Sequence, residues 1–101
     1  MKVIYTNQSY ESLKEATIFL LEEQGLPLKK ILNLRSKLLD RASHLVNTYN
    51  HHQEEEYLKH LGKSHRRVIE GYFKIIYRVE RNIIYITDFF DTRQDPIKMK
   101  V

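Results

Sequence analysis

The spacing of apolar residues changes once along this chain, from a helical period to an alternating one. Between residues 28 and 49 apolar side chains recur every three or four positions, as on one face of an amphipathic helix: Leu28, Ile31, Leu32, Leu38, Leu39, Ala42, Leu45, Val46 and Tyr49. Between residues 73 and 79 they alternate along one side of a strand: Phe73, Ile75, Tyr77 and Val79. Helices and strands each need a partner layer to bury their apolar side, so the sequence predicts an α+β fold.

The residues before this helix predict a strand and a first helix. Val3-Ile4-Tyr5 is β-prone, and residues 13–21 again have helical spacing. We expect the first helix to be capped by Ser9, or by a capping box of Ser12 and Glu15. The short joint Gly25–Pro27 predicts that the two helices pack as an antiparallel hairpin.

The residues after the second helix predict a loop and three strands. Asn50–Glu56 is polar and aperiodic, so we expect an exposed loop. The expected strands are residues 65–69, 73–79 and 83–90, with Arg81-Asn82 as a turn. The full prediction is a single domain, residues 1–101, with an N-terminal strand, an antiparallel helical hairpin and a three-stranded antiparallel C-terminal sheet. The helices should cover the sheet face that carries Phe73, Ile75 and Tyr77.

Composition narrows the classes of protein and of partner. Cysteine is absent, which excludes disulfides and thiolate metal sites. No apolar run approaches the roughly 20 residues of a membrane span, and no signal-peptide core follows Met1, so we expect a cytoplasmic protein without a membrane partner. Residues 57–101 carry 10 of the 17 Lys and Arg but only 5 of the 13 Asp and Glu. This basic half favours a phosphate-containing or acidic partner, although it also fits ordinary solubility charge.

Motifs of hydrolases, nucleotide-binding loops and zinc sites are absent from the sequence. His51-His52 and Glu54–Glu56 have the residue types of metal ligands. Adjacent histidines, however, lack the i, i+4 spacing that places two ligands on one helical face. We expect a solvated acidic loop there, and no metal or cofactor.

The remaining candidate cluster is basic and contains one imidazole. In a strand that begins at His65, the side chains of His65 and Arg67 point to the same face, and Lys74 lies on the next strand. Such a surface suits a phosphodiester, because cations stabilise phosphoryl charge and histidine exchanges protons near neutral pH. The alternative is that these residues, with Arg66, Arg78 and Arg93, form the solvated polar side of the sheet.

Two runs in the C-terminal half resemble the core strands of the RelE/ParE superfamily of bacterial toxins. They are His65-Arg66-Arg67-Val68-Ile69-Glu70-Gly71-Tyr72-Phe73-Lys74-Ile75-Ile76-Tyr77-Arg78-Val79-Glu80 and Ile84-Tyr85-Ile86-Thr87-Asp88-Phe89-Phe90-Asp91-Thr92-Arg93-Gln94-Asp95-Pro96. The expected order of elements is also that of the family.

The resemblance implies the toxin of a type II toxin–antitoxin pair. RelE-like members cleave mRNA on the ribosome, and the match places the nuclease residues at His65, Arg67, Lys74 and Arg93. ParE-like members inhibit DNA gyrase without enzymatic activity, and a third alternative is a binding module that has lost toxicity. The C-terminal Tyr or His of the nucleases has no counterpart after Pro96.

The expected partner is a cognate antitoxin, acidic where it touches residues 57–101, besides the ribosome and mRNA or DNA gyrase. The resemblance implies that part of this antitoxin folds on the toxin as a helix in a groove or as an added strand. Ile18 and Phe19 lie off the main apolar stripe and are candidate docking residues, or else they pack on the first strand.

Overall fold

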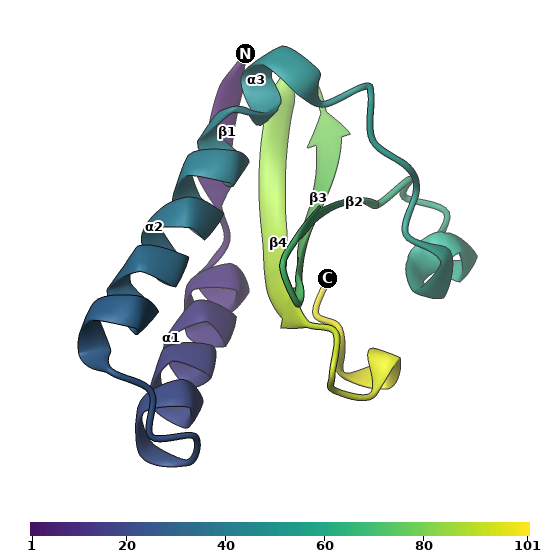
Figure 1. The fold of residues 1–101 in the computed structure, drawn as a ribbon. Helices are drawn as coiled ribbons and strands as arrows, with labels where there is room; N and C mark the ends of the chain where they lie inside the picture. The colour runs from purple at the N-terminus through teal and green to yellow at the C-terminus, as the bar shows by residue number, and fades with distance from the viewer.

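A four-stranded mixed sheet separates two helices from a set of irregular segments in the computed structural model, which describes residues 1–101 (Figure 1). The strands are β1 (Lys2–Tyr5), β2 (Arg66–Glu70), β3 (Phe73–Glu80) and β4 (Ile83–Asp91), in the order β1-β4-β3-β2. The predicted antiparallel arrangement of the last three strands is confirmed, and their bounds differ from the predicted ones by one residue at most. The N-terminal strand joins the same sheet and pairs with β4 in parallel.

The first helix begins earlier than predicted. Helix α1 (Asn7–Glu22) is capped by Thr6, whose hydroxyl accepts a hydrogen bond from the Ser9 amide at 3.2 Å. The expected cap at Ser9 or Ser12 is therefore wrong. Thr6 also donates its hydroxyl to the Ile86 carbonyl at 2.9 Å, and this contact with β4 fixes the helix start directly after β1.

The second helix is interrupted where the sequence predicts one continuous helix. Helix α2 (Leu28–Ser43) ends at His44, and a short helix, α3 (Leu45–Thr48), follows. The Ser43 hydroxyl donates to the Asp40 carbonyl at 2.8 Å, and the His44 ring lies 2.7 Å from the same oxygen. Because side chains compete here with the backbone for one carbonyl, the regular helix stops.

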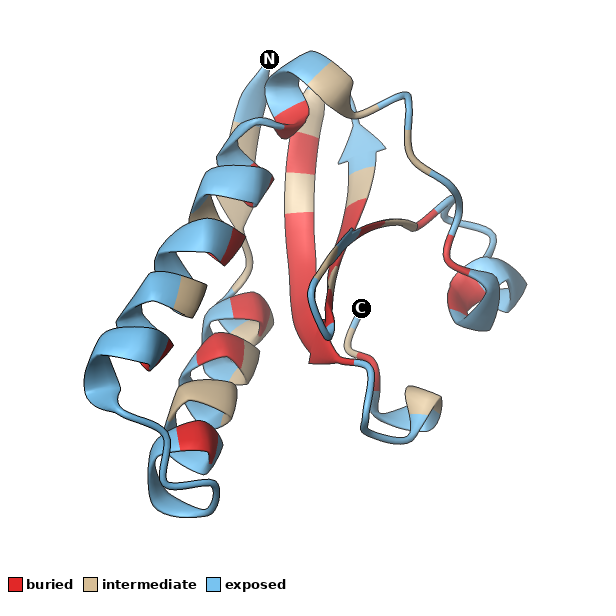
Figure 2. Cartoon of the chain, viewed as in Figure 1, coloured by how far each residue is buried: buried red, intermediate tan, exposed pale blue.

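The main core lies between the helices and the sheet face that carries Phe73, Ile75 and Tyr77, as predicted. Its buried helical members are Leu13, Leu38, Ala42 and Leu45. Figure 2 shows that the helices bury the side turned toward the sheet and leave the outer side exposed. Burying these apolar side chains removes them from water and holds the sheet on the hairpin.

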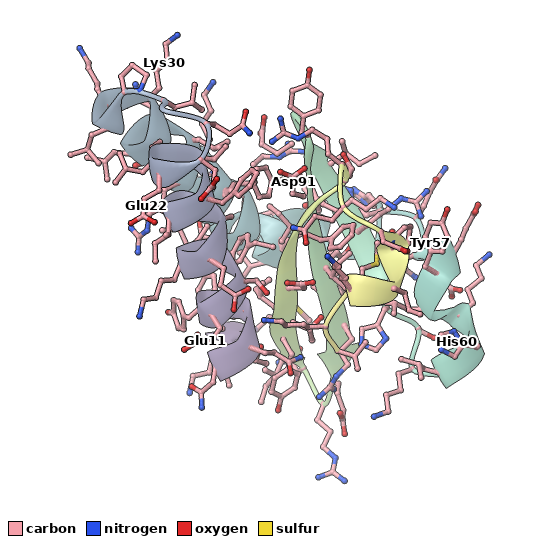
Figure 3. All side chains as sticks on the ribbon, turned by 90° about the horizontal axis from the view of Figure 1, so that it is seen from below. Glu11, Glu22, Lys30, Tyr57, His60 and Asp91 are labelled. Atoms are coloured by element: carbon pink, nitrogen blue, oxygen red, sulfur yellow. The ribbon has the colours of Figure 1, made fainter.

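A shorter segment covers part of the opposite sheet face. The 3₁₀ helix η1 (Glu56–Leu61) lies on the other side of the sheet from α1 (Figure 3), and a second 3₁₀ turn, η2 (Pro96–Lys98), precedes the C-terminal residues. A second small core forms from Leu58, Ile76, Phe90 and Met99. We call residues 53–61 the covering segment. No helix is long and apolar enough to span a membrane.

The prediction of an exposed loop over Asn50–Glu56 is wrong at one residue. Glu55 is completely buried, whereas Glu54 and Glu56 are exposed. The Glu55 amide donates to the His65 carbonyl at 2.8 Å, and Glu54 forms a β-bridge with Arg66. These backbone contacts hold the loop against β2 and turn the Glu55 side chain toward the sheet.

Candidate functional site

Three of the four predicted site residues share the sheet face that points away from α1 and α2, which we call the open face. Arg67 is paired in register with Ile76, a member of the second core, and therefore lies on this face. Lys74 is two residues before Ile76 on β3, and His65 is two residues before Arg67. Since side chains alternate along a strand, all three point to the open face.

A buried carboxylate forms ion pairs with two of these residues. Glu55 Oε1 lies 2.7 Å from Lys74 Nζ and 3.8 Å from Arg67 Nη1. The side chains of Lys74 and Arg67 are only 16% and 17% exposed, so little water competes for them. Their charges are thus held by the covering segment and are not directed at solvent.

Further contacts tie Arg67 and Glu55 to the same segment. Arg67 donates to the Glu54 carbonyl at 2.6 Å and to the Gln53 side chain at 3.0 Å. The second oxygen of Glu55 accepts a hydrogen bond from the Tyr57 amide at 3.1 Å. A ligand that needs Arg67 and Lys74 must therefore displace Glu55 or bind beside it.

His65 lies just before β2 and is almost completely buried, with 2% of its surface exposed. Neither of its ring nitrogens has a hydrogen-bond partner. Burial lowers the pKa of this imidazole, and the nearby positive charges of Arg78 and Lys63 lower it further. The ring is therefore neutral at neutral pH and offers one basic nitrogen, which is the state that a general base needs.

His65 lines a small cavity of about 250 Å³ together with two cations, Lys63 and Arg78. Arg78 lies over the Tyr85 ring, 4.5 Å from its centroid, and its guanidinium contacts Glu80 at 2.5 Å. Arg78 belongs to the basic cluster predicted from the sequence, whereas Lys63 does not. Lys63 lies in the turn after η1, where no periodic pattern indicates which way a side chain points.

Arg93 does not join the other predicted residues. Its guanidinium forms two hydrogen bonds with Asp91, at 2.9 and 2.7 Å, and lies 4.6 Å from the centroid of the Tyr72 ring. Asp91 pairs in register with Phe73, which faces the helices, so Arg93 is bound to a carboxylate on the side opposite the open face. The four residues therefore do not form one site.

A larger cavity, of about 1010 Å³, lies beside the C-terminal part of β4. Its apolar lining includes Ala16 and Phe19 of α1 and Phe89 and Phe90 of β4. Because β1 pairs only with Ile83–Ile86, the remainder of β4 has no neighbouring strand on this side. Burial raises the pKa of Asp88, another lining residue, although the Lys100 amide donates to it at 2.9 Å.

The histidines and acids nowhere form a group of three that could hold a metal ion. His51 and His52, which have the residue type of metal ligands, differ in their surroundings. The His52 ring lies 3.1 Å from the Thr48 hydroxyl, and His51 is exposed. No protein-family model matches the sequence, and no curated protein is found to be similar to it.

Proposed function

We propose that this chain is the toxin of a type II toxin–antitoxin pair and that its fold is of the RelE/ParE type. The order of one strand, two helices and three antiparallel strands supports the proposal, together with the motifs in residues 65–96. The observation that carries it is the open face, where a buried neutral histidine lies on the same side of the sheet as Arg67 and Lys74.

The mechanism that this face supports best is cleavage of ribosome-bound mRNA. The neutral imidazole of His65 takes the proton of a ribose 2′-hydroxyl, and the oxygen attacks the adjacent phosphorus. A cyclic phosphate forms, the bond to the 5′-oxygen breaks, and that oxygen receives a proton from water or from the protonated His65. Arg67 and Lys74 stabilise the charge on the phosphoryl oxygens once the RNA phosphate replaces the Glu55 carboxylate.

A second candidate function is non-enzymatic inhibition of DNA gyrase. One observation favours it: Glu55 already pairs with Lys74 and Arg67, and Asp91 pairs with Arg93, so three of the four nuclease residues form ion pairs within the chain. The missing Tyr or His after Pro96 points the same way. A toxin of this kind acts by binding alone.

The larger cavity supports a place for the antitoxin. It joins an apolar lining, including the half-exposed Phe19, to the part of β4 that lacks a neighbouring strand. An extended antitoxin segment could pair with this edge, and a helix could fill the apolar groove. Arg93, Lys98 and Lys100 line the same cavity, but Glu15, Asp88 and Asp91 line it too, so the apolar lining and the free strand edge support the docking site, and the charge of the cavity does not.

The test is to induce the chain alone in a bacterial host and to follow translation, mRNA integrity and DNA-damage signalling. Cleaved mRNA with early loss of translation is expected for the nuclease, and His65→Ala should abolish it. His60→Ala is the matched control, because His60 is exposed on η1. DNA damage with intact mRNA would select gyrase inhibition. Unimpaired growth despite soluble expression would overturn the toxin proposal.

The antitoxin proposal is tested by co-expressing the chain with the small acidic protein that the proposal expects a neighbouring gene to encode. We expect a stable complex that restores growth, and Phe19→Asp should weaken it. Glu11→Lys on the outer side of α1 is the control, since Glu11 is exposed and does not line the cavity. An unchanged complex with Phe19→Asp would exclude the groove as the docking surface.

A further inference from the structure

The small cavity beside His65 is formed where the open face meets the start of α1. Thr6, Asn7 and Gln8 line it from the helix, and Arg78 and Thr87 line it from the sheet. Lys63 and Val101 complete the lining. Residues from four distant parts of the chain thus meet around a volume of about 250 Å³.

The electrostatic character of this cavity is positive. Lys63 and Arg78 are its two cations, and none of its lining residues is an Asp or a Glu. The first turn of α1 has no acidic residue either. The amides of Asn7 and Gln8, at the start of the helix, have no intrahelical acceptor, and the helix dipole places partial positive charge at this end.

His65 gives the second, independent indication of a ligand. Its side chain is 2% exposed, it lines the cavity, and both of its ring nitrogens lack a hydrogen-bond partner. Buried polar atoms in folded proteins are nearly always hydrogen-bonded, so an unpartnered ring beside an open volume indicates a ligand that interacts with the ring. The charged side chains that line the cavity with it are Lys63 and Arg78, and both favour an anion there, although Arg78 also forms an ion pair with Glu80, which does not line the cavity.

We propose that this cavity is a binding site for a phosphate group, held by His65, Lys63, Arg78 and the first amides of α1. A phosphate oxygen accepts from the imidazole N–H, from the guanidinium and from the helix amides, which are the donors that anion sites use. The volume is below the range of roughly 300–1,000 Å³ typical of small-molecule pockets, so it suits a phosphate and little more of its ester.

The phosphate site is separate from the Glu55 cluster, because neither Arg67 nor Lys74 lines the cavity. The phosphate site is linked to the proposed nuclease function only through His65, which lines the cavity and is also the proposed general base. Free inorganic phosphate and the phosphate of a nucleotide or an RNA end share the chemistry required. When the anion binds, it offsets the repulsion from Lys63 and Arg78, and so it favours the protonated imidazole.

The experiment titrates the full chain with inorganic phosphate and follows the His65 ring resonances by NMR, with calorimetry in parallel. We expect a saturable shift of these resonances and an upward shift of the His65 pKa. Lys63→Gln should weaken binding about tenfold, the effect of losing one charge-assisted contact of about 1.4 kcal/mol. Lys63 is exposed, so this variant should fold normally, and Arg78→Gln should weaken binding at least as much. Lys59→Gln, on the exposed side of η1, is the control.

Two further arms identify the source of the phosphate. A short RNA with a 5′-phosphate is compared with the same RNA without it. Tighter binding of the phosphorylated RNA assigns the site to a nucleic-acid end, and equal binding of both RNAs with retained phosphate binding assigns it to the free anion. Unresponsive His65 resonances, or equal affinity in Lys63→Gln and the unsubstituted chain, would overturn the site. Growth arrest without phosphate binding would refute the site alone, whereas phosphate binding without growth arrest would refute the toxin proposal alone.

Discussion

Lys74 Nζ lies 2.7 Å from Glu55 Oε1, and this contact joins a completely buried carboxylate of the covering segment to β3, an inner strand of the sheet. Glu55 is flanked by two exposed glutamates in a hydrophilic stretch, yet it alone turns inward. Each of the two charges interacts with the other in place of water, and the ion pair holds residues 53–61 over the open face. It therefore couples the stability of the covering segment to the availability of Arg67 and Lys74.

Replacing Glu55 by Gln should destabilise the fold by about 1–3 kcal/mol, because two poorly exposed cations lose their carboxylate. Urea unfolding of the substituted and unsubstituted chains measures this free energy. Glu56→Gln, at an exposed neighbouring position, should change it by less than about 0.5 kcal/mol. The double substitution Glu55→Gln/Lys74→Met should recover part of the loss, since only Arg67 then lacks the carboxylate, and Arg67 keeps its hydrogen bonds to Glu54 and Gln53. Equal stability of Glu55→Gln and Glu56→Gln would show that the pair contributes nothing.

Leu38→Ala should cost about 2–5 kcal/mol of unfolding free energy, since the side chain is 1% exposed and belongs to the main core. Leu32→Ala is the matched control on the same helix, because Leu32 is 50% exposed. It should cost less than about 0.5 kcal/mol. Urea unfolding of both variants measures these losses, which appear as lower midpoint concentrations with an unchanged m value. Similar losses for both variants would mean that α2 does not pack on the sheet through Leu38.

The stability of the protein should fall as the pH drops below about 6.5, the usual pKa of a histidine in an unfolded chain. Burial, Arg78 and Lys63 lower the His65 pKa in the folded state, so between these two pKa values the unfolded chain binds a proton that the folded chain does not. Stability is then lost progressively with falling pH until the folded pKa is passed.

Urea unfolding at pH 7.5, 6.5 and 5.5 measures this dependence. His65→Gln should flatten it, whatever its effect on absolute stability, and His60→Gln should not. Burial also lowers the pKa of His52, which contributes with the same sign, so the difference between the variant and the unsubstituted chain isolates His65. An identical pH slope for His65→Gln would contradict the assignment of a buried neutral imidazole.

Arg93→Gln should raise the pKa of the Asp91 carboxyl. Burial alone raises that pKa, but the side-chain and backbone hydrogen bonds from Arg93 outweigh burial and hold it below its usual value. Carbon-detected NMR titration of the Asp91 carboxyl is the measurement, with Arg35→Gln on the exposed surface of α2 as the control. The stability cost should stay within about 1 kcal/mol, because the Arg93 side chain is 48% exposed.

The same variant also tests the role that the resemblance implies for Arg93. Since Arg93 is bound on the side opposite the open face, Arg93→Gln should leave mRNA cleavage unchanged in an induced culture. A strong loss of cleavage would place Arg93 at the reacting phosphate and would require that it leave Asp91.

The apolar pattern predicted most of the fold because each side chain in a helix or strand points in a direction that its position in the element sets. Period and turn chemistry therefore indicated the three C-terminal strands, the sheet face that meets the helices, and the turn at Arg81-Asn82, where both residues adopt positive φ. The apolar pattern did not predict the helix start at Thr6 or the break at His44. The start depends on a side-chain hydrogen bond from Thr6 to β4, and the break depends on the contacts of Ser43 and His44 with the Asp40 carbonyl.

The sequence by itself determined the four strands, the two long helices and which sides of them are apolar, because those properties are local and periodic. Only the tertiary structure decided which charges meet. It buried Glu55 against Lys74, 19 residues away, and placed His65 beside Arg78 and the start of α1. The physical reason is that a polar side chain is stabilised by one particular partner at hydrogen-bond distance, and no local pattern of residues specifies which distant segment supplies that partner.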